Sequence, residues 1–245
     1  MTKPNSDAPP VARGVPFSSV PDAFGLYDPR FEHDACGVSF ICHIKGRASR
    51  SIVTDALDAL CNLDHRGASG AEVNTGDGAG ILLQVPDRFF RAVVDFPLPP
   101  AGAYGVGLAF LPLDAEAAEK TMGRINAIVE DEGLRVVGWR EVPVDTSMIG
   151  PTALSVVPGF QQLFVADPGG ATGLELDRLL FVVRKRCEHE LAELDGPGAG
   201  DEVVYFPSLS SRTLVYKGML TTPQLPEFFP DLADDRVESA LALVH

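Results

Sequence analysis

The sequence predicts a layered α+β fold in which antiparallel strands pack against helices. Short apolar runs of strand length alternate with longer segments whose apolar residues recur at helical spacing. Several strands follow one another across short turns, which favours antiparallel pairing over a purely doubly wound sheet. With 45% hydrophobic and 22% charged residues, the 245-residue chain has enough apolar side chains for one large or two small domain cores.

The first third of the chain contains a leader, a strand and a helix. Residues 1–30 are rich in proline and lack periodicity, which predicts a flexible leader. Cys36–Ile44 is mostly apolar and predicts a strand. Ser51–Leu63 has the periodicity of an amphipathic helix, in which we expect Cys61 to be a buried packing residue. After a glycine-rich loop, Ile81–Val85 is the next expected strand.

The middle of the chain continues the alternation of helices and strands. Pro86–Val94 predicts a short helix, because proline is favoured in a first helical turn. Tyr104–Leu111 is strand-like. Asp114–Glu132 predicts a long helix, with its aspartate as the cap and Gly133 as the stop. Leu134–Pro143 is the strand that follows.

The last part of the chain adds a strand, a helix and an expected hairpin. Phe160–Ala166 predicts a strand, and Glu175–Glu193 predicts a helix in which Cys187 is structural or half-exposed. A low-complexity loop follows. Val203–Pro207 and Thr213–Tyr216 are then expected to pair as a hairpin.

Composition excludes several classes of function. A net charge of −14 argues against nucleic-acid binding and against a polybasic membrane anchor. The polar N-terminus is not a secretory signal, and apolar windows stay below the ~18 residues of a membrane span. Four cysteines without a C-x-x-C pair, and five scattered histidines, predict no metal site and a cytoplasmic protein with reduced thiols.

Two loop motifs are candidates for a site. The glycine turn Gly76–Gly80 precedes a strand and lacks a P-loop lysine, which disfavours a nucleotide site. It is either a tight turn between strands or a backbone surface that a substrate approaches closely. Arg66, which follows the first helix, either pairs with carbonyls at the helix end or binds a carboxylate.

Cys36 is the candidate nucleophile. A thiol needs a base, and spacing assigns no histidine to it, which disfavours a cysteine protease. Cleavage between Ala35 and Cys36 would make the cysteine's own α-amine the base, because an α-amine titrates near pH ~8. The alternative is an uncut cysteine that serves only in packing.

Six segments occur in an order that resembles a known family. They are CGVSFICHIKG, LCNLDHRGASGAE, TGDGAGILLQVP, SLSSRTLVYKGML, QLPEFFPDL and ESALALVH. Together, from Tyr27 to His245, they resemble the glutaminase domain at the start of the glutamate synthase large subunit. That domain is a class II glutamine amidotransferase of the N-terminal-nucleophile hydrolase fold.

The resemblance implies a four-layer αββα sandwich, a propeptide at residues 1–35 and an amidotransferase domain at residues 36–245. It implies that Cys36 becomes the first residue, attacks the side-chain amide of glutamine and uses its own α-amine as the base. It implies that Arg66 organises the nucleophile end of the site, and that Gly76, Asp77 and Gly78 lie near the substrate pocket.

The resemblance also implies partners beyond these residues. In the family, the ammonia aminates 2-oxoglutarate in a synthase region that holds FMN and an iron–sulfur cluster. Electrons come from ferredoxin or from a small NAD(P)H-oxidising subunit, and no cofactor is expected in this chain itself.

Two departures from the family pattern remain. Ser39 stands where many relatives have glycine. The chain ends at His245, before the family's carboxylate-binding arginine and its Asn-Gly oxyanion pair. We therefore expect an incomplete sandwich with little or no glutaminase activity of its own. The alternative function is a non-catalytic interaction or regulatory module that keeps the fold.

Overall fold

A computed structural model describes Gly25 and residues 36–66, 72–194 and 204–245. The chain divides into two units, Met1–Asp34 and Ala35–His245, and the architecture below is that of the second unit. The expected leader and the low-complexity loop after the Glu175–Glu193 helix lie outside the described residues, apart from Gly25.

In the described residues, eight strands form two four-stranded sheets in which all pairs are antiparallel, in the orders β1-β8-β2-β7 and β4-β5-β3-β6. The strands are β1 (Ser39–Cys42), β2 (Ala79–Gln84), β3 (Gly105–Leu111), β4 (Arg135–Glu141), β5 (Gly159–Ala166), β6 (Leu209–Ser210), β7 (Thr213–Gly218) and β8 (Leu241–Val244).

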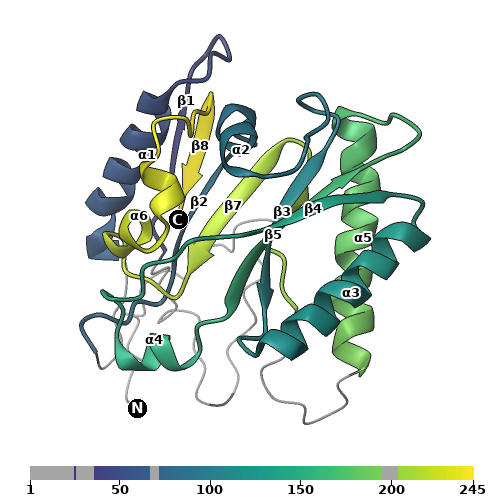
Figure 1. Ribbon diagram of the computed structural model, residues 1–245. Helices are drawn as coiled ribbons and strands as arrows, with labels where there is room; N and C mark the ends of the chain where they lie inside the picture. The colour runs from purple at the N-terminus through teal and green to yellow at the C-terminus, as the bar shows by residue number, and fades with distance from the viewer. Residues whose placement is uncertain (1–24, 26–35, 67–71, 195–203) are drawn as a thin grey trace, which may run out of the picture. The chain divides into compact units, whose positions relative to one another are not determined.

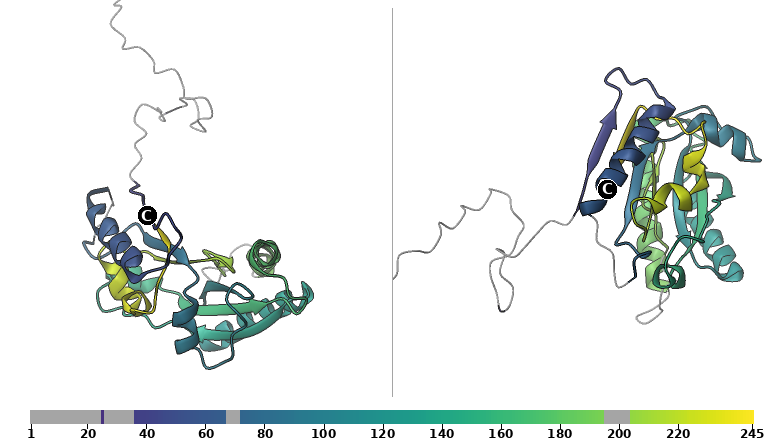
Figure 2. Two further views of the ribbon diagram at one scale, coloured as in Figure 1. Left: turned by 90° about the horizontal axis from the view of Figure 1, so that it is seen from above. Right: turned by 90° about the vertical axis from the view of Figure 1, so that its left-hand side faces the viewer.

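Helices cover the two sheets from opposite sides. The helices are α1 (Arg50–Asn62), α2 (Asp87–Val93), α3 (Ala115–Asp131), α4 (Pro151–Ser155), α5 (Gly173–Leu194) and α6 (Gln224–Phe228), with 3-10 turns η2 (Asp64–Arg66) and η3 (Pro230–Ala233). Helix α1 packs on β1 and β8, whereas α3 and α5 pack on each other and on the second sheet. Figures 1 and 2 show α1 and α5 on opposite sides of the sheets. The helix–sheet–sheet–helix order confirms the expected αββα sandwich.

The helix ends follow the sequence signals. The Asp114 carboxylate accepts a hydrogen bond of 2.9 Å from the Ala117 N–H, which satisfies one of the free donors of the first turn of α3. Gly133 ends the same helix with a φ of +74°, a conformation that costs glycine little. The predicted cap and stop are both confirmed.

The buried apolar side chains form two hydrophobic clusters, and strand β5 contributes to both. Phe160 and Phe164 belong to a cluster that also includes residues of α1 and of both sheets, whereas Leu163 and Val165 pack under α3 and α5. Because successive side chains of a strand point to opposite faces, a strand buried on both faces has a nearly continuous apolar sequence. This explains the unbroken apolar run at Leu163–Ala166.

The predicted hairpin is wrong. Tyr205 forms an isolated bridge with Phe110 of β3, and β6 pairs with β3 in the second sheet. Strand β7 pairs instead with β2 in the first sheet. The two expected arms therefore belong to different sheets, because residues far away in sequence offer both of them better partners.

The prediction for Cys61 is also wrong, since its side chain is exposed on α1. The helix buries Ile52, Val53 and Leu60 among others, and Cys61 follows on the outward side. Cys187 belongs to α5 and is fully buried in the core, as a structural cysteine would be. The sequence patterns do not predict the elements α4, α6, β6, β8, η2 and η3.

Candidate functional site

A pocket of about 720 Å³ opens where the first sheet meets the residues before β1. Its contributors come from α1, both sheets and the loops at their ends. They are Cys36, Gly37, Leu60, Leu63, Asp77, Gly78, Ala79, Gly80, Ile81, Leu82, Phe110, Tyr205, Val215, Lys217, Gly218, Met219, Thr222, Leu243 and His245.

Three of the five predicted site residues line this pocket, and a fourth lies behind it. Cys36 lies three residues before β1, is exposed, and lines the same pocket as Asp77 and Gly78. Gly76 is buried behind this surface and does not line the pocket itself. The structure therefore brings the candidate thiol and the glycine turn together, although they are about 40 residues apart in sequence.

The glycine turn leads from the loop Glu72–Thr75, which is not a strand, into β2. A Cβ atom on Gly76 would lie 2.3 Å from the Leu220 carbonyl oxygen, so the two loops touch backbone to backbone. Gly78 has a φ of +146°, which L-residues with a side chain rarely adopt. Of the two alternatives for this motif, the described residues favour a backbone surface on the pocket over a turn between two strands.

The turn that contains Arg66 is connected to the pocket by one hydrogen bond. The hydroxyl of Thr222, a pocket residue, donates to the Asp64 carboxylate over 2.8 Å. Arg66 ends the same turn, η2, but its side chain lies outside the described part of the molecule. The role of Arg66 stays a prediction.

Lys217 and Tyr205 form a pair of pocket residues that sequence patterns did not single out. The Lys217 ammonium lies 3.4 Å from the Tyr205 hydroxyl and 5.2 Å from the centre of the Tyr205 ring. A single lysine in a strand carries no functional signal by itself, so only the pairing of β7 with β2 reveals the position of Lys217. The pocket thus combines a thiol, a cation and a glycine backbone, which suits a small ligand with a carboxylate and a reactive carbonyl.

Two other thiols in the described residues, those of Cys187 and Cys61, are less suited to nucleophilic chemistry. Burial raises the pKa of Cys187 to about 12, which keeps this thiol protonated. The pKa of Cys61 is also raised, first by partial burial and then by the carboxylates of Asp58 and Asp64. Thiolates rather than thiols are the reactive species, so neither residue is favoured as a nucleophile.

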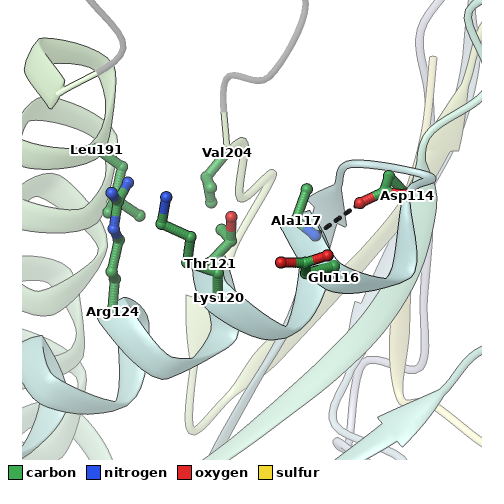
Figure 3. A pocket seen from close by; sticks show the side chains of 8 residues that line it. All are labelled: Asp114, Glu116, Ala117, Lys120, Thr121, Arg124, Leu191 and Val204. Atoms are coloured by element: carbon green, nitrogen blue, oxygen red, sulfur yellow. Dashed lines mark hydrogen bonds between the residues drawn. The ribbon is translucent and has the colours of Figure 1, made fainter.

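A smaller pocket of about 270 Å³ lies on α3, with Leu191 of α5 and Val204 on its other side (Figure 3). Lys120 and Arg124, one helical turn apart, line it. It includes none of the predicted site residues. Within the described ranges, no three His, Cys, Asp or Glu side chains are grouped as a metal site, and no helix has the length and apolarity to cross a membrane.

Comparison with known proteins identifies the family. The model of the family described as glutamine amidotransferases class-II matches residues 36–245. The chain belongs to the class-II glutamine amidotransferases. The amidotransferase match begins at Cys36, the residue that lies in the large pocket beside the glycine turn.

Three similar proteins are named glutamate synthases. The glutamate synthase [NADPH] large chain of Bacillus subtilis is 44% identical over 94% of the chain and 15% of its own length. The glutamate synthase [NADH] of Schizosaccharomyces pombe is 39% identical over 93% of the chain and 11% of its own length. The ferredoxin-dependent glutamate synthase 2 of Arabidopsis thaliana is 36% identical over 98% of the chain and 15% of its own length. The chain thus spans a small fraction of these relatives.

Proposed function

We propose that residues 36–245 belong to the glutaminase domain of a glutamate synthase, which hydrolyses glutamine to glutamate and ammonia. The observation that carries this proposal is the position of Cys36. It is the first residue of the amidotransferase match and shares a pocket with Asp77 and Gly78. The similarity to three glutamate synthases with different electron donors supports the same assignment.

In the proposed mechanism, removal of residues 1–35 frees the α-amine of Cys36. The amine takes the thiol proton, and the thiolate attacks the side-chain amide carbon of glutamine. The C–N bond breaks, the protonated amine returns its proton to the nitrogen, and ammonia leaves a γ-glutamyl thioester. Water, deprotonated by the amine, then attacks the thioester, so that the C–S bond breaks and glutamate is released.

The division of the chain supports a removable leader. The second unit begins at Ala35, one residue before Cys36, and the family match begins at Cys36 itself. We assign Arg66 to organising the nucleophile end of the site. We assign Gly76, Asp77 and Gly78 to the surface on which the substrate lies, because Asp77 and Gly78 line the pocket and Gly76 supports them.

The remainder of the longer protein completes the proposed reaction. There, ammonia is consumed in the amination of 2-oxoglutarate with FMN and an iron–sulfur cluster. The donor is ferredoxin or a reduced nicotinamide oxidised by a small subunit. The relatives' names include NADPH, NADH and ferredoxin, so they do not select one donor.

We also propose that the 245 residues alone hydrolyse glutamine poorly. Among the described residues that line the pocket, the cationic side chain is that of Lys217, and none is an arginine. Arginine binds a carboxylate with two parallel hydrogen bonds, which lysine does not reproduce. Full activity from the 245-residue chain, measured as ammonia release beside the full-length protein, would overturn this proposal.

The function is tested by a Cys36→Ser variant of the full-length protein. We expect its rate of glutamine hydrolysis to fall by at least about 10³-fold, as for other essential nucleophiles. The matched control is Cys42→Ser, which changes an exposed thiol on β1 that does not line the pocket. Equal activity of Cys36→Ser and wild type would exclude Cys36 as the nucleophile. A wild-type protein that keeps residues 1–35 and hydrolyses no glutamine would indicate a non-catalytic module instead.

A further inference from the structure

Gln224, the first residue of α6, has its side-chain amide buried between three separate loops. Its side chain is only 5% exposed. The amide oxygen accepts a hydrogen bond of 2.8 Å from the Thr221 N–H. The amide nitrogen donates to the Asn74 carbonyl over 3.0 Å and to the Met148 carbonyl over 2.7 Å. The two N–H protons of the Gln224 amide are therefore donated to carbonyl oxygens in two different loops.

Two of these loops supply residues that line the Cys36 pocket. Asn74 lies two residues before the glycine turn, whose Asp77 and Gly78 line the pocket. Thr221 lies between two further pocket residues, Met219 on one side and Thr222 on the other. Gln224 itself does not line the pocket, so any effect on the reaction passes through the loops that it connects.

The contact between the two loops leaves little room for adjustment. The Gly76 backbone packs directly on the Leu220 carbonyl, where a Cβ would be only 2.3 Å away. The third loop adds a further bond, because the Gly150 N–H donates to the same Asn74 carbonyl over 2.8 Å. The position of the glycine turn thus depends on the buried amide that spans all three loops.

We propose that Gln224 is a positioning residue for the glutaminase reaction, and this inference rests on the proposed function. Its amide sets the distance between the glycine turn and the loop of residues 218–222. Both loops supply lining residues of the pocket in which a glutamine substrate must present its amide carbon to Cys36. Misplacement of a reacting group by about 1 Å can cost on the order of 10²-fold in rate.

The variant that tests this is Gln224→Met in the full-length protein. Methionine keeps the length of the side chain but removes the amide, so the Met148 carbonyl and the Thr221 N–H lose this partner, while the Asn74 carbonyl keeps its bond from Gly150. The matched control is Gln162→Met. Gln162 is a fully buried glutamine whose amide bonds Arg140 and Tyr216 in the core and does not line the pocket.

The measurement compares two reagents that alkylate Cys36. The glutamine analogue 6-diazo-5-oxo-norleucine needs the substrate surfaces, whereas iodoacetamide needs only an accessible thiolate. We expect Gln224→Met to slow labelling by the analogue about tenfold or more and to change iodoacetamide labelling less than twofold. Gln162→Met should leave the ratio of the two rates at the wild-type value, even where it lowers the melting temperature.

Four outcomes would overturn the inference. The first is a wild-type ratio in folded Gln224→Met, and the second is the same change of ratio in Gln162→Met. If Gln224→Met does not fold, Gln224→Asn replaces it, since its shorter amide cannot reach all three partners, and an unchanged ratio there is equally contradictory. A wild-type enzyme whose Cys36 the analogue does not label would overturn the proposed function, and the inference with it.

Discussion

Gly76 is the residue at which the absence of a side chain matters most for the site. Its Cα lies against the Leu220 carbonyl, and a methyl group there would occupy space that real Cβ atoms do not share with a backbone oxygen. The neighbouring Gly78 is required for a different reason, namely its φ of +146°. Gly76 thus allows the two loops to touch behind the pocket, and Gly78 places a bare backbone on the pocket itself.

Replacing Gly76 with alanine is expected to destabilise the domain by about 1–3 kcal/mol, because the backbone must shift to admit the methyl group. The control is Gly123→Ala. Gly123 is exposed in α3, with no atom within 4 Å of a Cβ, so alanine should stabilise there by about 0.5–1 kcal/mol. Chemical denaturation measures both changes, and a shift of the same sign in both variants would contradict this explanation.

At the scale of elements, the Glu72 carboxylate connects the loop before the glycine turn to the start of α4. It accepts hydrogen bonds from the Thr152 N–H over 3.1 Å, from the Thr152 hydroxyl over 2.7 Å and from the Thr75 hydroxyl over 2.7 Å. These bonds lower the pKa of Glu72, with the Thr152 hydroxyl as the largest cause. A carboxylate at a helix N-terminus also satisfies donors that the helix itself cannot pair.

The lowered pKa predicts how the stability contributed by Glu72 depends on pH. A group whose pKa is lowered on folding stabilises the folded state above its unfolded value of about 4.3, and this contribution is lost as pH falls through the folded pKa. We expect Glu72→Gln to lower the free energy of unfolding near pH 7. The difference from wild type should shrink as the pH drops below about 4. A difference that stays constant from pH 7 to pH 3 would exclude the ionised carboxylate as its source.

At the scale of the whole domain, a buried polar network connects the two sheets. Arg140 of β4 binds the Asp231 carboxylate with two hydrogen bonds of 2.7 and 2.8 Å, and the Tyr216 hydroxyl of β7 donates to the same carboxylate over 2.9 Å. Gln162 of β5 bonds both Arg140 and Tyr216. Burial and the adjacent carboxylate raise the pKa of Tyr216 well above its usual value, so its hydroxyl remains a donor.

Removing one partner of the buried Arg140–Asp231 pair should lower the free energy of unfolding far more than removing both partners. Asp231→Ala leaves the Arg140 guanidinium without its carboxylate in the core, and we expect a loss of about 3–5 kcal/mol in the free energy of unfolding. The double variant Arg140→Met/Asp231→Leu should be more stable than Asp231→Ala, since no charge is left unpaired. Urea denaturation decides this, and a loss below about 1 kcal/mol for Asp231→Ala would show that the pair is effectively solvated.

Local patterns predicted those parts of the fold that depend on nearby residues. The cap and stop of α3, the helical face of α1 and the apolar strand β5 all follow from periodicity and short-range signals. The choice of sheet for β6 and β7 depends on β3 and β2, about 100 to 130 residues earlier, and no local pattern records it. The predicted hairpin failed for that reason.

The site was predictable to a similar extent. Cys36 and the glycine turn were recognisable as motifs, but their placement in one pocket required the folded chain. Thr222 and Gln224 lie in a short segment with a proline, where polar residues usually indicate a loop in solvent. Their roles depend on burial and on partners such as Asp64 and Asn74, which sequence spacing does not show.

The central claim is that Cys36, freed as the first residue, carries the γ-glutamyl group. Acid quenching of the full-length enzyme during glutamine turnover, followed by peptide mass spectrometry, tests this directly. We predict a γ-glutamyl adduct on a peptide that begins at Cys36. An adduct on another residue, or turnover by protein in which Ala35 and Cys36 remain joined, would contradict the account.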